Sequence, residues 1–72
     1  MNQNSKTIIA TNIKKLREQT DLTREKLSLA LEFENSYISK LENARINITI
    51  ERLDKIADYF KIKTFELLIS RD

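Results

Sequence analysis

Apolar residues recur at intervals of three and four positions along most of the chain, with charged residues between them. Leu27 and Leu31 lie four positions apart, and Ile38 and Leu41 lie three positions apart. Either spacing puts two side chains on one face of a helix. Phe33 stands between the two pairs, where the chain is too short for an ordinary loop. The pattern therefore predicts two short helices joined by a tight turn.

The same periodicity extends to both sides of this central pair and predicts an all-α fold. We expect a compact bundle of about five helices, over residues 6–19, 24–31, 35–42, 50–60 and 64–69. Thr23 and Thr49 stand where helix-capping hydroxyls are expected, and Asn4 or Ser5 is available to cap the first helix. Residues 1–5 are expected to fray.

The central pair has the sequence signature of a helix-turn-helix. Ser28 is a small residue at the point where the two helices would come closest. The second helix would begin with Asn35, Ser36 and Tyr37, whose side chains are suited to reading the edges of DNA bases. This region is therefore the candidate site, and the flanking helices are expected to support it.

Composition narrows the remaining possibilities. A chain of 72 residues buries only roughly 60% of its unfolded surface, so residues 1–72 are expected to form one domain. The absence of Cys and His leaves no disulfide, thiol nucleophile or imidazole metal ligand. With no Gly-rich phosphate loop either, we expect no enzyme, no metal, no cofactor and no small-molecule ligand.

No apolar run approaches the roughly 18 residues of a membrane span, and the first residues lack the pattern of a signal peptide. We therefore expect a cytoplasmic protein without a membrane partner. The net charge is only +2, but Lys6, Lys14, Lys15 and Arg17 precede the first acidic residue, Glu18. This basic end is compatible with phosphate contacts and equally with a solvated helix face.

The C-terminal segment carries more apolar surface than a short terminal helix can bury within its own domain. Phe65, Leu68 and Ile69 occur in addition to Leu67, which is expected to point inward. The three extra side chains are therefore expected to contact a second chain.

The stretch LTREKLSLALEFENSYISKLENARINITIERLDKIADYFKIKTFELL resembles the lambda-repressor and Cro-like (Xre-type) helix-turn-helix regulators. The resemblance implies a sequence-specific transcriptional regulator, often a repressor, that binds a pseudo-palindromic operator in double-stranded DNA as a homodimer. Among stand-alone members, residues 47–50 and 37–39 look most like the controller proteins of restriction-modification operons. A phage repressor remains the other reading within this class.

The resemblance also assigns roles to residues. Asn35, Ser36 and Lys40 would read bases, with Ser39 near the edge of the groove, because amide, hydroxyl and ammonium groups match the donors and acceptors of bases. The DNA backbone would be contacted by Arg24, Tyr37, Asn43, Arg45 and Asn47. The alternative for Tyr37 is packing against the second helix, and the alternative for Arg45 is an ordinary solvated charge. Arg17 and Glu42 would form a structural salt bridge.

Glu32, Ala44 and Lys61 stand where family members often have Gly. If these positions need a positive φ, each is strained by roughly 1 kcal/mol or more. Glu34 lies close to the DNA-facing helix, where it would either suppress non-specific binding or accept a hydrogen bond from cytosine. These acidic residues leave one alternative function open, a helical protein-interaction module or antitoxin-like partner protein. Salt-dependent DNA binding would separate the two functions.

Overall fold

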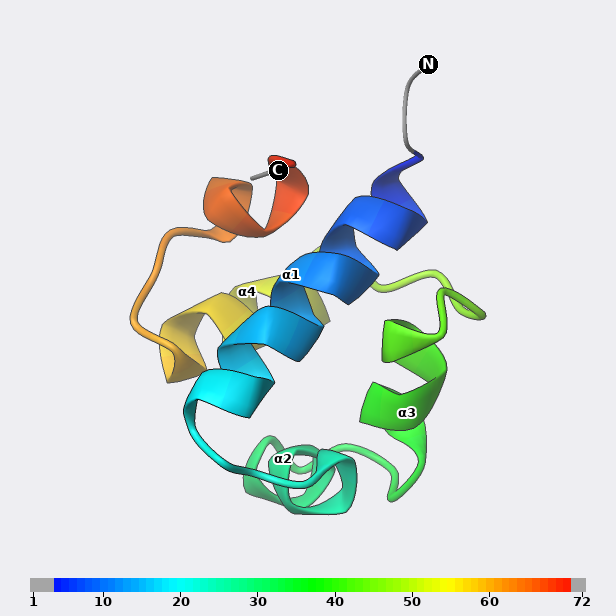
Figure 1. The fold of residues 1–72 in the computed structure, drawn as a ribbon, viewed down its shortest axis with the longest axis vertical. Helices are drawn as coiled ribbons and strands as arrows, with labels where there is room; N and C mark the ends of the chain where they lie inside the picture. The colour runs from blue at the N-terminus through cyan, green and yellow to red at the C-terminus, as the bar shows by residue number, and fades with distance from the viewer. Residues whose placement is uncertain (1–3, 71–72) are drawn as a thin grey trace.

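The computed structural model describes residues 4–70, and no strand occurs among them. The elements, in chain order, are α1 (Ser5–Gln19), α2 (Arg24–Ala30), α3 (Tyr37–Glu42), α4 (Ile50–Tyr59) and the 3-10 helix η1 (Thr64–Leu68). The predicted all-α bundle is confirmed. Helix α1 runs diagonally through the molecule, α2 crosses one end of it, and η1 lies beside its N-terminal half (Figure 1).

All five elements contribute to one core. Each supplies a side chain with no exposed surface, namely Ile13, Leu27, Ile38, Ile56 and Leu67. Burial of an aliphatic side chain of this size stabilises a fold by about 1.5–3 kcal/mol. Ile46 and Ile48 are half-buried against the core, so both anchor the connection between α3 and α4. The core thus holds α3 between α1 and α2 and leaves its outer face free.

Polar caps begin three of the α-helices. The side chain of Asn4 accepts a hydrogen bond from the Thr7 amide at 2.9 Å. The hydroxyls of Thr23 and Thr49 accept in the same way, as predicted. Asn4 caps α1 and Ser5 is its first residue, and the expectation that these two residues fray stays a prediction. The rest of that expected segment, residues 1–3, lies outside the described residues.

Two predicted helices differ from the structure at their boundaries or type. Helix α3 begins at Tyr37 rather than Asn35, because residues 35 and 36 form a turn that the Tyr37 amide closes on the Glu34 carbonyl at 2.9 Å. The last segment is a 3-10 helix rather than an α-helix. There the side-chain amide of the buried Asn12 donates to the backbone carbonyls of Leu67 and Ile69, both at 2.9 Å. These tertiary bonds satisfy carbonyls at the end of η1.

Four non-glycine residues have positive φ: Asp21 at 59°, Glu32 at 62°, Ala44 at 57° and Lys61 at 59°. The last three are the positions where Gly was expected from the family pattern. Each of the four residues immediately follows the cap of an α-helix. At α2, for example, the amides of Glu32 and Phe33 donate to the carbonyls of Leu29 and Ser28, which is the Schellman arrangement. The chain, which has no Gly, therefore ends its helices with strained residues.

Candidate nucleic-acid interface

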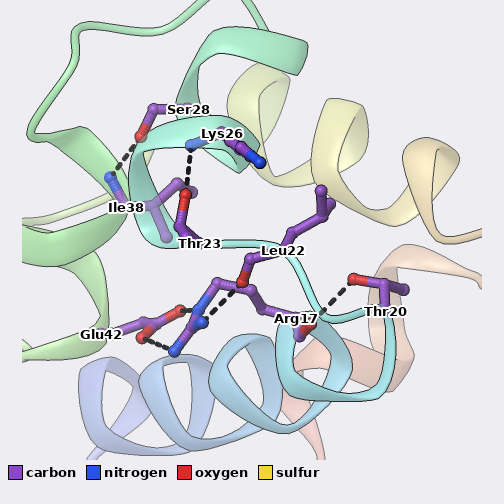
Figure 2. Close-up of polar contacts among 8 residues, drawn as sticks. All are labelled: Arg17, Thr20, Leu22, Thr23, Lys26, Ser28, Ile38 and Glu42. Atoms are coloured by element: carbon purple, nitrogen blue, oxygen red, sulfur yellow. Dashed lines mark hydrogen bonds and ion pairs between the residues drawn. The ribbon is translucent and has the colours of Figure 1, made fainter.

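The C-terminal end of α3 is fastened by a buried ion pair. Arg17 on α1 donates from Nε to Oε2 of Glu42 at 2.7 Å and from Nη2 to Oε1 at 3.1 Å. Its Nη1 donates to the Leu22 carbonyl at 2.8 Å, so one guanidinium joins α1, the connection before α2, and α3 (Figure 2). Only 13% of the Arg17 side chain and 2% of the Glu42 side chain are exposed.

This pair has the geometry of a structural salt bridge. The hydrogen bond to Glu42 is the main reason that the pKa of Arg17 is raised, and burial opposes it. The guanidinium therefore stays charged, and its Nε and Nη2 groups both donate to Glu42 on α3. Removing one partner of such a pair leaves the other charge buried, which is the costly outcome.

The N-terminal end of α3 is fastened by a residue from another helix. Ser36 is the cap of α3 but makes no capping hydrogen bond with its side chain. Instead the completely buried hydroxyl of Ser28 on α2 accepts a hydrogen bond from the Ile38 amide at 3.1 Å (Figure 2). In the sequence, Ser28 was singled out only for its small size. The signal that could have revealed this role was its hydroxyl, a hydrogen-bonding group at the point where the two helices come closest.

Between these two fastenings, α3 presents a polar surface. Asn35, Ser36 and Lys40 are exposed and Ser39 is half-buried. Ser36 and Lys40 line a shallow depression together with Asn47 from the loop that follows α3. The structure thus places two predicted base-reading residues beside two predicted backbone contacts, Asn47 and Tyr37. Asn35 and Ser36 lie in the turn before α3 rather than within the helix.

Three other predicted backbone contacts do not line this depression. Arg24 is the first residue of α2 and is exposed. Asn43 and Arg45 are exposed in the connection after α3. All three side chains are accessible to a ligand, and none of them lines the depression that Ser36 and Lys40 share.

The ring of Tyr37 is packed against neighbouring side chains. Only 9% of the residue is exposed, and its ring lies 4.8 Å from the Phe33 ring and 4.5 Å from the Arg52 guanidinium carbon. A ring packed in this way is not available to stack on a sugar or a thymine methyl group. We assign the ring to packing, against Phe33 and Arg52, and a contact of its hydroxyl with phosphate stays a prediction.

A second Arg–Glu pair, not expected from the sequence, lies at the N-terminal end of α3. Arg52 on α4 donates from Nη1 and Nη2 to the two carboxylate oxygens of Glu34 at 3.1 and 3.2 Å. This pair is exposed, by 36% at Arg52 and 66% at Glu34. The pKa of Glu34 is lowered chiefly by the hydrogen bonds from Arg52 and next by a backbone hydrogen bond. Glu32 forms a similar exposed pair with Lys55 at 3.4 Å.

Comparison with known proteins gives this architecture a family. Residues 13–67 match the family described as Helix-turn-helix. The chain belongs to the helix-turn-helix family. The predicted Xre-type resemblance is confirmed, and with it the prediction of a DNA-binding transcriptional regulator. Family membership accordingly points to a regulator rather than to an enzyme.

One curated protein and one solved structure are similar to this chain. The chain is 36% identical over 56 residues to control protein C.MunI from a Mycoplasma species, an alignment that spans 76% of each protein. The crystal structure of the hypothetical transcription factor NHTF from Neisseria superposes with a TM-score of 0.90 over 96% of this chain and 79% of that one. At 23% identity, the second likeness shows the fold alone.

Two further observations apply to residues 4–70 of this helix-turn-helix protein. None of its helices is both long and apolar enough to cross a membrane. No group of three or more His, Cys, Asp or Glu side chains in that part of the chain is arranged to hold a metal ion.

Proposed function

We propose that this protein binds a pseudo-palindromic operator as a homodimer and controls transcription of a restriction-modification operon. The observation that carries the proposal is the exposed polar surface of α3, where Ser36, Lys40 and Asn47 share one depression on a helix fastened at both ends. The relationship to a protein named control protein C.MunI supports the choice of operon.

In the proposed complex, the N-terminal end of α3 enters the major groove. Asn35 pairs with adenine, Lys40 reaches O6 and N7 of guanine, and Ser36 donates or accepts at several bases, with Ser39 at the edge of the contact. A rigid α3 matters because these side chains must meet base edges within hydrogen-bonding distance. The contacts at Ser28 and Glu42 supply that rigidity.

Contacts with the DNA backbone orient the protein on the duplex. Arg24 and Arg45 would donate to phosphates on either side of the groove, with Asn43 and Asn47 as uncharged donors. All four side chains are exposed, so none needs to break a core contact to reach a phosphate. These contacts supply affinity for any sequence, and the α3 side chains supply the preference for one.

The proposed dimer uses the exposed apolar surface of the C-terminal segment. Phe65, Leu68 and Ile69 are exposed by 56%, 41% and 50%, although η1 itself is held to α1 by Asn12. Pairing of two copies through these side chains would shield them from water. Two recognition helices related by the dimer axis would then enter successive major grooves, roughly 34 Å apart.

The proposal is tested by sequencing the genomic fragments that the purified protein retains. We expect a two-fold symmetric motif upstream of a restriction-modification operon. Ser36→Ala and Asn35→Ala should each weaken binding to that motif by about 1–3 kcal/mol and relax its preference, whereas Arg24→Ala should weaken binding to all sequences. Equal losses for Asn35→Ala on specific and random DNA would remove Asn35 from the base-reading residues. A motif without two-fold symmetry would contradict the dimer.

The alternative, a protein-interaction module or antitoxin-like partner, rested on the acidic residues near α3. In the structure Glu32 and Glu34 are both paired with cations from α4, which reduces their repulsion of DNA. Binding to the protein's own upstream DNA that weakens with added salt favours the regulator. A lack of such binding favours the alternative.

A further inference from the structure

We propose that Arg52 is a phosphate-binding residue that Glu34 holds in the free protein. When DNA binds, the guanidinium exchanges the Glu34 carboxylate for a phosphate of the DNA backbone. The inference rests on the proposed function, because it adds a DNA contact to the same surface. It concerns a pair of residues that the sequence pattern did not place together.

The position of Arg52 supports this role. Arg52 and Glu34 line the same depression as Ser36, Lys40 and Asn47, although Arg52 belongs to α4 and the others to α3 and its flanking segments. Any DNA strand that brings its bases to Ser36 and Lys40 also brings its phosphates near this depression. Arg52 is therefore a cation located where the ligand is expected.

The guanidinium is also held in a defined position by groups other than Glu34. Its central carbon lies 4.5 Å from the centre of the Tyr37 ring and 4.9 Å from the centre of the Phe33 ring. Contact with two aromatic rings restricts the plane of the guanidinium and leaves the N–H groups at its edge free to bond. Loss of Glu34 would therefore leave Arg52 in place and ready to bind another oxyanion.

Glu34 and a phosphate compete for the same donors. Glu34 occupies Nη1 and Nη2 with its two oxygens, and a phosphate binds a guanidinium through two parallel hydrogen bonds in the same way. The pair is exposed to solvent, and exposed pairs contribute little net stability. Exchange of one oxyanion for the other is therefore easy, in contrast to the buried pair at Glu42.

This arrangement gives a physical basis for one of the two roles open to Glu34, the suppression of non-specific binding. In the free protein both oxygens of the Glu34 carboxylate accept hydrogen bonds from Arg52. Every DNA sequence must therefore compete with Glu34 for Arg52. Glu34 thereby lowers the affinity for random DNA, where few base contacts compensate for the competition.

The test measures affinity for operator and random DNA between 50 and 200 mM salt. Arg52→Gln should make the slope of log K against log salt shallower by about one unit, so that its loss of affinity relative to wild type shrinks about three- to fourfold across that range. Glu34→Gln should bind random DNA about two- to fivefold more tightly, the effect expected from removing one exposed ion pair. In the Arg52→Gln background, Glu34→Gln should give no further gain.

Each contrary result has a distinct meaning. An equal gain for Glu34→Gln in both backgrounds would show that Glu34 only repels phosphate and would overturn the exchange. An unchanged slope for Arg52→Gln would remove Arg52 from the phosphate contacts while leaving the proposed function intact. Absence of salt-dependent binding in the wild-type protein would overturn both.

If Arg52→Gln does not fold, the test is made in the wild-type protein by NMR. Operator DNA should move the signal of the Glu34 carboxyl group toward the position of an unpaired carboxylate. A signal that does not move would overturn the exchange.

Lys55 provides a matched control. It lies on the same helix, contacts the same Phe33 ring at 5.5 Å and pairs with Glu32, but it does not line the depression. Lys55→Gln should leave the salt slope unchanged. A slope change equal to that of Arg52→Gln would mean that net charge, rather than a contact by Arg52, is being measured.

Discussion

The two ends of α3 are each approached by an arginine that binds a glutamate through two hydrogen bonds, but the two pairs have different environments. Glu42, at the C-terminal end, is 2% exposed, and Glu34, before the N-terminal end, is 66% exposed. Water screens the second pair and is excluded from the first. The same two residue types therefore form a buried structural ion pair at the C-terminal end of α3 and a solvent-exposed ion pair near its N-terminal end.

The two ends of α3 are also held in place by different side chains. At the C-terminal end the Arg17 guanidinium reaches the Leu22 carbonyl as well as Glu42, so three segments depend on one side chain. At the N-terminal end the structural task belongs to Ser28, whose hydroxyl binds the Ile38 amide. Arg52 and Glu34 are thus free to take part in binding without loosening α3.

The largest expected effect comes from breaking the buried pair. Glu42→Ala leaves the Arg17 charge without its partner and should lower the free energy of unfolding by roughly 3–5 kcal/mol. For a domain of this size, each kcal/mol corresponds to about 4–8 °C in melting temperature. Thermal unfolding followed by circular dichroism measures the change. Glu34→Ala is the matched control and should change the melting temperature little; equal melting temperatures for the two variants would contradict the comparison.

The next effect tests which serine fastens the N-terminal end of α3. Ser28→Ala removes the acceptor of a buried amide and should lower the free energy of unfolding by about 1–3 kcal/mol. Ser36→Ala, at the formal cap, removes no capping bond and should change it by no more than about 0.5 kcal/mol. Chemical denaturation of both variants makes the measurement. A larger loss for Ser36→Ala would transfer the capping role to Ser36.

A smaller effect of opposite sign is expected where the helices end. Ala44 and Lys61 have φ of 57° and 59°, a region that Gly enters without steric strain. Ala44→Gly and Lys61→Gly should each raise the free energy of unfolding by about 0.5–1 kcal/mol. Asp58→Gly, within α4, is the control and should lower it by about 1 kcal/mol. Destabilisation by all three changes would show that strain at these ends does not limit stability.

The smallest effect is a change in titration at the exposed pair. The pKa of Glu34 lies below its ordinary value of 4.5, chiefly because Arg52 donates to it. A lowered folded-state pKa means that the pair contributes to folding above the unfolded-state pKa and that this contribution is lost as pH falls through the folded-state pKa. Arg52→Gln should return the Glu34 pKa toward 4.5, as measured by NMR titration. Identical titration curves in the two proteins would show that Arg52 does not stabilise the Glu34 carboxylate in solution.

Several features of the fold could be predicted because they depend on near neighbours in the chain. Helical spacing of apolar residues located every element, and Thr23 and Thr49 marked two helix starts through bonds to amides three residues later. The family pattern further indicated the strained positions Glu32, Ala44 and Lys61. Asp21, the fourth such residue, was missed because no comparable expectation existed for that turn.

Other features were missed because the spacing of apolar residues does not reveal them, and most of them depend on distant residues. The start of α3 was placed too early because Asn35 and Ser36 are polar enough to begin a helix, whereas the Tyr37 amide closes a turn on Glu34. The 3-10 form of η1 accompanies bonds from Asn12, which lies 55 residues before Leu67. Ion pairing of Arg52 with a residue 18 positions away left no periodic signal. The Arg17–Glu42 pair was expected only through the family resemblance.

The sequence by itself determined the all-α class, the order of the helices and the family, because hydrophobic spacing and local capping act over three or four residues. Only the tertiary structure decided what each polar residue near α3 does. Ser28 is a cap because α2 brings it to Ile38, and Tyr37 is a packing residue because Arg52 and Phe33 cover its ring. Burial distinguishes Glu42 from Glu34, and burial is a property of the packed chain rather than of either residue.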